Sequence, residues 1–278
     1  MNQTLDAVSE HYGPPGLIGR LKAALAGFGP EDQLLQPEQL AGLDQFHTRG
    51  LAATRELAAL AGIGVETVVL DVGSGIGGPA RFLAATFGCK VTGVDLSQPF
   101  VDGARYLTQR TGQIDRVTFE VGSALELPLP DSSFDVALLQ HVAMNIQDRA
   151  GLYHEIHRVL HKGGTFATYD IVLRSGDPHY PVPWATSPAT SFLLPAEATS
   201  DAIKAAGFVP VVIQDNTEAA KVWAEEVRAS DAPPMPHLGV VMGSGFPELT
   251  GNLARNLLED RIGVLTAVFR VEGKGDTP

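Results

Sequence analysis

Residues 68–78 read VVLDVGSGIGG, and this stretch decides the fold that we expect. An apolar run of strand length leads into a glycine-rich turn, and residues 78–87 then have the pattern of a helix. Glycine tolerates a positive φ and lets a ligand approach the backbone, while the first N–H groups of a helix stay free to bind that ligand. The stretch therefore predicts a strand, a ligand-binding turn and a helix in succession.

The same alternation of strands and helices continues along the chain, and with short connections it predicts a doubly wound α/β sheet. Before it, residues 17–28 and 48–61 read as helices, with Thr48 as an N-cap, Gly62 just past the second helix, and a loop rich in Gln and Pro between the two. We expect one domain over 1–278, made of a helical lid (1–62), a ligand-binding core (63–172) and cap insertions with the last strands (173–278). Further strands are expected at 90–94, 117–121, 134–139, 165–172, 208–214 and 263–271, and further helices at 97–111, 149–160, 195–206 and 218–229.

Composition narrows the class of protein. The chain has 278 residues, 20 Lys plus Arg and 32 Asp plus Glu, so its net charge is −12. An acidic chain without a basic cluster argues against nucleic acid or an anionic membrane as the main partner. Cys89 is the single cysteine, which excludes an internal disulfide and a Cys-rich metal site. The N-terminus does not read as a signal peptide, so we expect a cytoplasmic protein. We also expect no bound metal, and a monomer or homodimer.

Carboxylates mark the expected ligand site. Asp95 ends the next strand, where an acid can accept hydrogen bonds from both hydroxyls of a ribose. The glycines at 73, 75 and 78 also satisfy the dinucleotide fingerprint loosely. However, Asp71 would repel a pyrophosphate, and Arg81 is the only cation in the first turns of the helix. A ligand with a ribose and a cationic amino acid head suits these charges better, and S-adenosylmethionine has both.

Four segments resemble motifs of the class I S-adenosylmethionine-dependent methyltransferases: LDVGSGIGGPARFLA (70–84), VTGVDLS (91–97), GSALELPLPDSSFDVAL (122–138) and RVLHKGGTFATYD (158–170). The resemblance covers about 44–271. It implies a Rossmann-like, seven-stranded sheet with an antiparallel last strand. Segments 44–47, 140–145 and 180–184 are similar to small-molecule methyltransferases of the sarcosine/dimethylglycine, tocopherol and ubiquinone-pathway kind.

The resemblance also implies roles for individual residues. Those expected to bind the cofactor are Asp71, Gly73, Ser74, Gly75, Asp95, Leu96, Ser97, Ser123, Ala124, Gln140 and Gln45. Many family members have Asp where this chain has Ser123, so the contact with the adenine amino group is expected to be weaker. The usual Lys/Arg-Pro-Gly-Gly turn is His161-Lys162-Gly163-Gly164 here, which affects a turn alone.

Methyl transfer from a sulfonium is an in-line displacement, and catalysis can rest largely on alignment. Aromatic faces near the sulfonium can add cation–π attraction. We expect the acceptor to contact Tyr12, His47, His141, Tyr180 and Trp184. Because histidine is the natural base near neutral pH, His141 is the first choice for a catalytic residue and His47 the second.

Other functions remain open from the sequence. A nicotinamide-dependent oxidoreductase would use the same glycine turn. A relative of the fold could bind S-adenosylmethionine without transferring its methyl group, as a regulator, an accessory subunit or a non-methylating catalyst. The acceptor also stays open, because a moderately apolar molecule and a methylated amine fit the sequence about equally.

Overall fold

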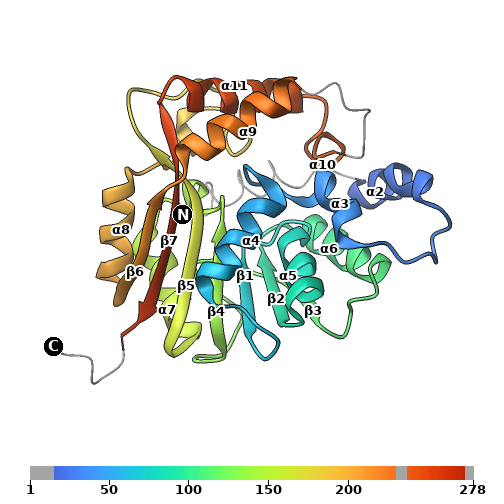
Figure 1. The fold of residues 1–278 in the computed structure, drawn as a ribbon, viewed down its shortest axis with the longest axis horizontal. Helices are drawn as coiled ribbons and strands as arrows, with labels where there is room; N and C mark the ends of the chain where they lie inside the picture. The colour runs from blue at the N-terminus through green and yellow to red at the C-terminus, as the bar shows by residue number, and fades with distance from the viewer. Residues whose placement is uncertain (1–15, 230–236, 273–278) are drawn as a thin grey trace.

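A seven-stranded sheet forms the centre of the molecule in the computed structural model, which describes residues 16–229 and 237–272 (Figure 1). Its strand order is β3-β2-β1-β4-β5-β7-β6, and β7 runs antiparallel to both of its neighbours. The remaining pairs are parallel, so the expected doubly wound sheet with an antiparallel last strand is confirmed. The strands are β1 (Val68–Val72), β2 (Lys90–Asp95), β3 (Val117–Val121), β4 (Phe134–Gln140), β5 (Leu160–Leu173), β6 (Phe208–Asp215) and β7 (Ile262–Val271).

Helices cover both faces of this sheet because its central strands are apolar on both sides. Along β1, Val69 belongs to one hydrophobic cluster, and Leu70 and Val72 belong to another. The first cluster includes side chains of α4 (Gly50–Ala61), α5 (Gly78–Phe87) and α6 (Gln98–Arg110). The second includes side chains of α7 (Arg149–Val159) and α8 (Ala196–Ala205). This two-sided burial is typical of parallel strands.

A cap of helices lies over the upper edge of the sheet in Figure 1. It consists of α9 (Thr217–Ala229), α10 (Gly239–Met242) and α11 (Phe246–Leu258). The N-terminal helices α2 (Leu17–Leu25) and α3 (Pro37–Asp44) approach it from the side of α6. Val241 of α10 is buried among Leu17 and Leu21 of α2, and Arg20 Nε donates to Val240 O over 2.9 Å. The helix α2 therefore packs against α10 of the cap over the same edge of the sheet.

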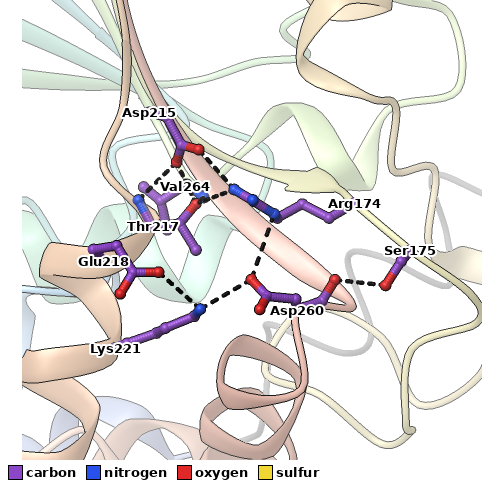
Figure 2. A network of polar contacts seen from close by, with 8 residues as sticks. All are labelled: Arg174, Ser175, Asp215, Thr217, Glu218, Lys221, Asp260 and Val264. Carbon is purple, nitrogen blue, oxygen red and sulfur yellow. Dashed lines mark hydrogen bonds and ion pairs between the residues drawn. The ribbon is translucent and has the colours of Figure 1, made fainter.

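A polar network fastens the base of α9 to the sheet (Figure 2). Arg174, just after β5, pairs with Asp215 at 2.6 Å and with Asp260 at 3.6 Å. Lys221 of α9 pairs with the same Asp260 at 2.9 Å. Thr217 Oγ1 accepts a hydrogen bond from the backbone N–H of Val264 in β7 over 3.0 Å. The network thus joins three segments that are distant in sequence.

Most of the expected elements match within two residues, and the departures have local causes. Thr48 does not cap a helix: α4 begins at Gly50, and Arg49 in the left-handed region (φ 64°) occupies the cap position. Residues 37–44 form α3 where we expected a loop, because Pro37 starts the helix and Gln39 Oε1 accepts from Gln36 N. The strand expected at 165–172 begins earlier, at Leu160.

Candidate active site

A cavity of about 1220 Å³ opens where the carboxyl ends of β1, β2 and β4 meet. Ligands bind at this edge in open α/β sheets. Among the described residues, the floor comes from the glycine turn after β1 and from the ends of β2 and β4. One wall comes from the segment between α3 and α4, and the roof comes from α9, α10 and α11.

The glycine turn positions the backbone for a ligand. Gly73 has φ 72°, and a Cβ at this position would collide with the Val142 side chain. The N–H of Gly75, which has φ 53°, donates to Asp95 Oδ2 over 2.8 Å. The N–H of Ser97 donates to the other oxygen, Oδ1, over 2.9 Å. Because a carboxylate oxygen accepts more than one hydrogen bond, Asp95 is held firmly and still has acceptor capacity.

The two carboxylates make this end of the cavity electronegative. Asp71 is 2% exposed, and its Oδ2 has no hydrogen-bond partner among the described residues. Burial and the neighbouring Asp95 raise the pKa of Asp71 to about 7. Burial also raises the pKa of Asp95, although its two backbone hydrogen bonds act to lower it. Such a pair favours a positively charged ligand.

The cation that could have balanced these acids is engaged elsewhere. Arg81 is fully buried and donates to Asp44 Oδ2 over 2.7 Å, which ties α5 to α3. Its second terminal nitrogen donates to Ala104 O and Thr108 Oγ1, both in α6. Arg81 therefore serves helix packing and does not provide the positive charge that a pyrophosphate needs.

A chain of polar groups follows β4. His141 has φ 54°, in the left-handed region that residues other than glycine rarely adopt, and its N–H donates to Tyr169 O over 2.9 Å. Its ring stacks on Tyr169 with centroids 5.4 Å apart. Thr48 Oγ1 lies 3.4 Å from His141 Nε2 and 2.9 Å from the Tyr169 hydroxyl. A strained residue inside a cavity is typical of functional sites.

A second histidine lies next to this chain. His47 is 4% exposed, and its Nε2 lies 3.0 Å from both Gly50 O and Thr54 Oγ1. Burial lowers the pKa of His47 to about 4. Burial, together with His47, holds the pKa of His141 well below its usual value. Both imidazoles are therefore neutral near pH 7.

Comparisons with known proteins agree with this geometry. Residues 70–168 match the family model described as a methyltransferase domain. This segment contains Asp71, the glycine turn and Asp95, so the core of the chain is similar to that methyltransferase domain. The sterol 24-C-methyltransferase of Eremothecium gossypii is 36% identical over 117 residues, which are 42% of this chain and 31% of the relative. The chain thus matches about a third of the length of that relative.

Solved structures extend the likeness to nearly the whole chain. A geranyl diphosphate C-methyltransferase from Streptomyces coelicolor A3(2) is 17% identical and has a TM-score of 0.71 over 96% of this chain and 98% of its own. The [4+2]-cyclase SpnF is 22% identical, with a TM-score of 0.67 over 94% and 98% of the two chains. At these identities the likeness shows the fold.

The cavity brings together most of the residues that the sequence singled out. Tyr12 lies outside the described residues. Tyr180 is not among the residues that line the cavity and instead packs, half-buried, against the core, so the structure does not place it with the others. The expected residues that do line the cavity are Gln45, His47, Asp71, Gly73, Ser74, Gly75, Asp95, Leu96, Ser97, Ser123, Ala124, Gln140, His141 and Trp184.

The sequence analysis missed some candidate functional residues that the structure places at the cavity. Thr48 reads as a cap, and Tyr169 reads as one more apolar residue of a buried strand. The register of β5 against β4 places Tyr169 opposite Gln140, which no local pattern reveals. Trp223 of α9 and Phe246 of α11 join the cavity from the cap. Within 16–229 and 237–272, no three potential metal ligands gather at one point.

Proposed function

We propose that the protein transfers a methyl group from S-adenosylmethionine to a small-molecule acceptor. The observation that carries this proposal is the pair Asp71 and Asp95 on either side of a glycine turn, at the floor of a large cavity. When bound, the cofactor supplies a methyl group that its sulfonium has already activated. The protein then needs to hold the two reactants in line and exclude water, and a deep cavity does both.

The residues present fit this cofactor. The Asp95 carboxylate has acceptor capacity for ribose hydroxyls, as expected for the acid that ends the second strand. The unpaired Oδ2 of Asp71 can accept from an ammonium group, and Gly73, whose bare Cα packs against the Val142 side chain, lines the cavity next to it. Ser123 Oγ already accepts from Leu125 N over 3.1 Å, so its hydroxyl proton is free to be donated. Leu96 lies beside it on the cavity wall.

His141 is proposed to orient the acceptor. Burial raises the pKa of the Tyr169 hydroxyl, and the nearby Arg49 guanidinium opposes that rise. We propose that the Tyr169 hydroxyl turns its proton away from this cation, toward Thr48, and that the Thr48 proton is directed to His141 Nε2. The ring proton of neutral His141 then lies on Nδ1. In this state His141 can donate a hydrogen bond from Nδ1 to the acceptor. It can remove a proton from the acceptor only if Nδ1 is unprotonated, which requires the hydrogen bonds among His141, Thr48 and Tyr169 to reverse their direction.

Calorimetry with S-adenosylmethionine, S-adenosylhomocysteine and NADH tests the proposal. We expect heat with the first two ligands and none with NADH. Asp95→Ala should weaken S-adenosylmethionine binding by about 1.5–3 kcal/mol, the value of a hydrogen bond to a charged group. Val222→Ala, on the exposed side of α9, is a matched control outside the cavity. An Asp95→Ala variant with wild-type affinity contradicts the proposal.

The alternatives differ in how well they fit. A nicotinamide-dependent oxidoreductase is disfavoured because Arg81 is bound to Asp44 and leaves Asp71 beside any pyrophosphate. A non-methylating catalyst stays as the second candidate, supported by the fold shared with the [4+2]-cyclase. Release of S-adenosylhomocysteine with a supplied acceptor separates it from methyl transfer.

We propose a location in the cytoplasm, because the single cysteine, Cys89, is a buried free thiol, as is typical of proteins from reducing compartments. We propose a monomer or a homodimer, without a preference. No helix within the described ranges is long and apolar enough to cross a bilayer. The proposed partner is a small-molecule acceptor, and neither a nucleic acid nor a membrane is proposed.

A further inference from the structure

The cavity is larger than one ligand requires. Pockets for drug-sized ligands measure about 300–1,000 Å³, and this cavity measures about 1220 Å³. The cofactor proposed above takes the end between Asp71 and Asp95. The other end lies under α9, α10 and α11, and we call this part the acceptor chamber. Its size suits a second molecule that is considerably larger than an amino acid.

The walls of the acceptor chamber are apolar. Trp184, 3% exposed, lies between β5 and α8 in sequence and lines the chamber from the side of the sheet. Its indole N–H is already satisfied by Ser191 Oγ at 2.9 Å, so it offers the chamber an apolar face. The cap helices add the side chains of Trp223, Met242, Phe246 and Leu253.

Away from Asp71 and Asp95, the charged groups that line the cavity either have partners of their own or face solvent. Arg49 forms a bidentate pair with Glu56 at 2.6 and 2.8 Å. Asp148 accepts from Gly151 N at the start of α7, and Asp44 holds Arg81. Arg228 of α9 is exposed to solvent. A carboxylate, a phosphate or an ammonium group on the acceptor would lose its hydration in the chamber without gaining an opposite charge, which is costly.

From volume, walls and charge together, we propose that the acceptor is a bulky, uncharged and largely apolar molecule with a hydrogen-bonding group at its reacting end. This inference rests on the proposed function, because the position of the cofactor decides which end of the cavity is available to the acceptor. The polar groups near that junction include His141 and Asn145, and Asn145 Oδ1 is buried without a hydrogen-bond partner among the described residues. Small zwitterions such as sarcosine do not fit these walls.

Intrinsic fluorescence can report on the chamber directly. The chain has two tryptophans, Trp184 and Trp223, and both line the cavity. We would titrate the full-length protein with N-phenylnaphthylamine, a neutral apolar probe that accepts energy from tryptophan. We expect saturable energy transfer at one probe per chain. Sarcosine and phosphoethanolamine, as charged probes, should neither displace it nor change the tryptophan emission.

Gly251 of α11 provides the matched variants. It lines the cavity at a solvent-exposed position, and a Cβ placed on it meets no atom within 4 Å, so a side chain there has room. Gly251→Glu and Gly251→Met add chains of similar length, of which one is charged. Both remove a helix glycine, so neither is expected to unfold α11. Gly251→Glu should weaken the probe at least about 10-fold relative to Gly251→Met. Val222→Glu, with its charge on the exposed side of α9, should leave probe binding unchanged.

Each outcome bears on one of the two proposals. If S-adenosylhomocysteine binds but the neutral probe does not saturate, the acceptor proposal is overturned and the proposed function stands. The same holds if Gly251→Glu and Gly251→Met bind the probe equally, or if sarcosine displaces it. If the probe binds as described but S-adenosylhomocysteine does not, the proposed function fails while the apolar chamber is supported.

Discussion

The titration of Asp71 gives the sharpest prediction about the cofactor. Its pKa is raised to about 7, by burial first and by Asp95 second. A cationic ligand binds the ionised form, so its affinity should rise with pH through this range. An opposite charge within about 4–6 Å lowers a carboxyl pKa by about 1–3 units. For such a shift, the dissociation constant of S-adenosylmethionine should fall roughly 10- to 30-fold between pH 5.5 and pH 8, or about 1.4–2 kcal/mol.

Calorimetry measures this effect in two ways. Dissociation constants from pH 5.5 to 8 give the slope, and buffers of different ionisation enthalpy give the protons released at pH 7. His47 and His141 do not obscure the result, since the pKa of His47 is about 4 and that of His141 is well below its usual value. Burial also raises the pKa of Asp170 to about 6, and Asp170 contacts the backbone N–H of Ala143 near the cavity.

Asp71→Asn separates these contributions, because it imitates the protonated form and leaves Asp170 in place. We expect this variant to bind S-adenosylmethionine as weakly at pH 8 as the wild type does at pH 5.5. It should also be the more stable protein at pH 8. A carboxyl whose folded pKa is raised stabilises the fold at low pH, and that stability is lost as pH rises toward about 7. A wild-type affinity that is flat with pH, or an unchanged slope in the variant, would refute the reasoning.

Other predictions concern the supports of the site. Asp44→Ala leaves the fully buried Arg81 without its partner and should cost about 3–5 kcal/mol of unfolding free energy, measured by urea denaturation; a loss below about 1 kcal/mol contradicts the pairing. Gly73→Ala should destabilise the turn by about 1–3 kcal/mol and weaken S-adenosylhomocysteine binding, since its Cβ meets Val142; unchanged binding in calorimetry argues against this close approach. Tyr169→Phe keeps the ring under His141 but removes the hydroxyl, so nitrogen NMR of labelled histidine should show Nδ1–H in the wild type and a mixture of both tautomers in the variant. A wild-type Nε2–H signal would reverse the proposed direction of the chain.

The sequence was most informative where local chemistry determines structure. The turn at residues 73–75 and the acids at 71 and 95 could be located because glycine and carboxylate requirements are local and follow from strand ends. The sheet followed from alternating segments, each of which buries one or two apolar faces. The antiparallel last strand came from the resemblance to a family. The strand order needed the structure, since no local pattern fixes which strand pairs with which.

The cap and the hydroxyl chain needed the structure. Thr48 lies between α3 and α4 and looks like an N-cap, but its hydroxyl bonds Tyr169, which is 121 positions away. Tyr180, expected in the site, turned out to pack against the core, because the end of that loop presents Trp184 to the cavity instead. The sequence did not predict the helices α10 and α11 within segment 216–260, because glycines and prolines interrupt the apolar periodicity there. Contacts of this kind depend on tertiary packing.

The ion pairs that attach α9 to the sheet affect how the specificity of this fold can evolve. Arg174, Asp215 and Asp260 hold the base of the cap with side chains that are 39–62% exposed, and none of them lines the cavity. Residues that shape the chamber and residues that attach it are therefore separate sets. Substitutions at Trp223, Phe246 or Leu253 can alter the range of accepted molecules while the attachment persists, so new specificities can arise on this scaffold without first loosening it.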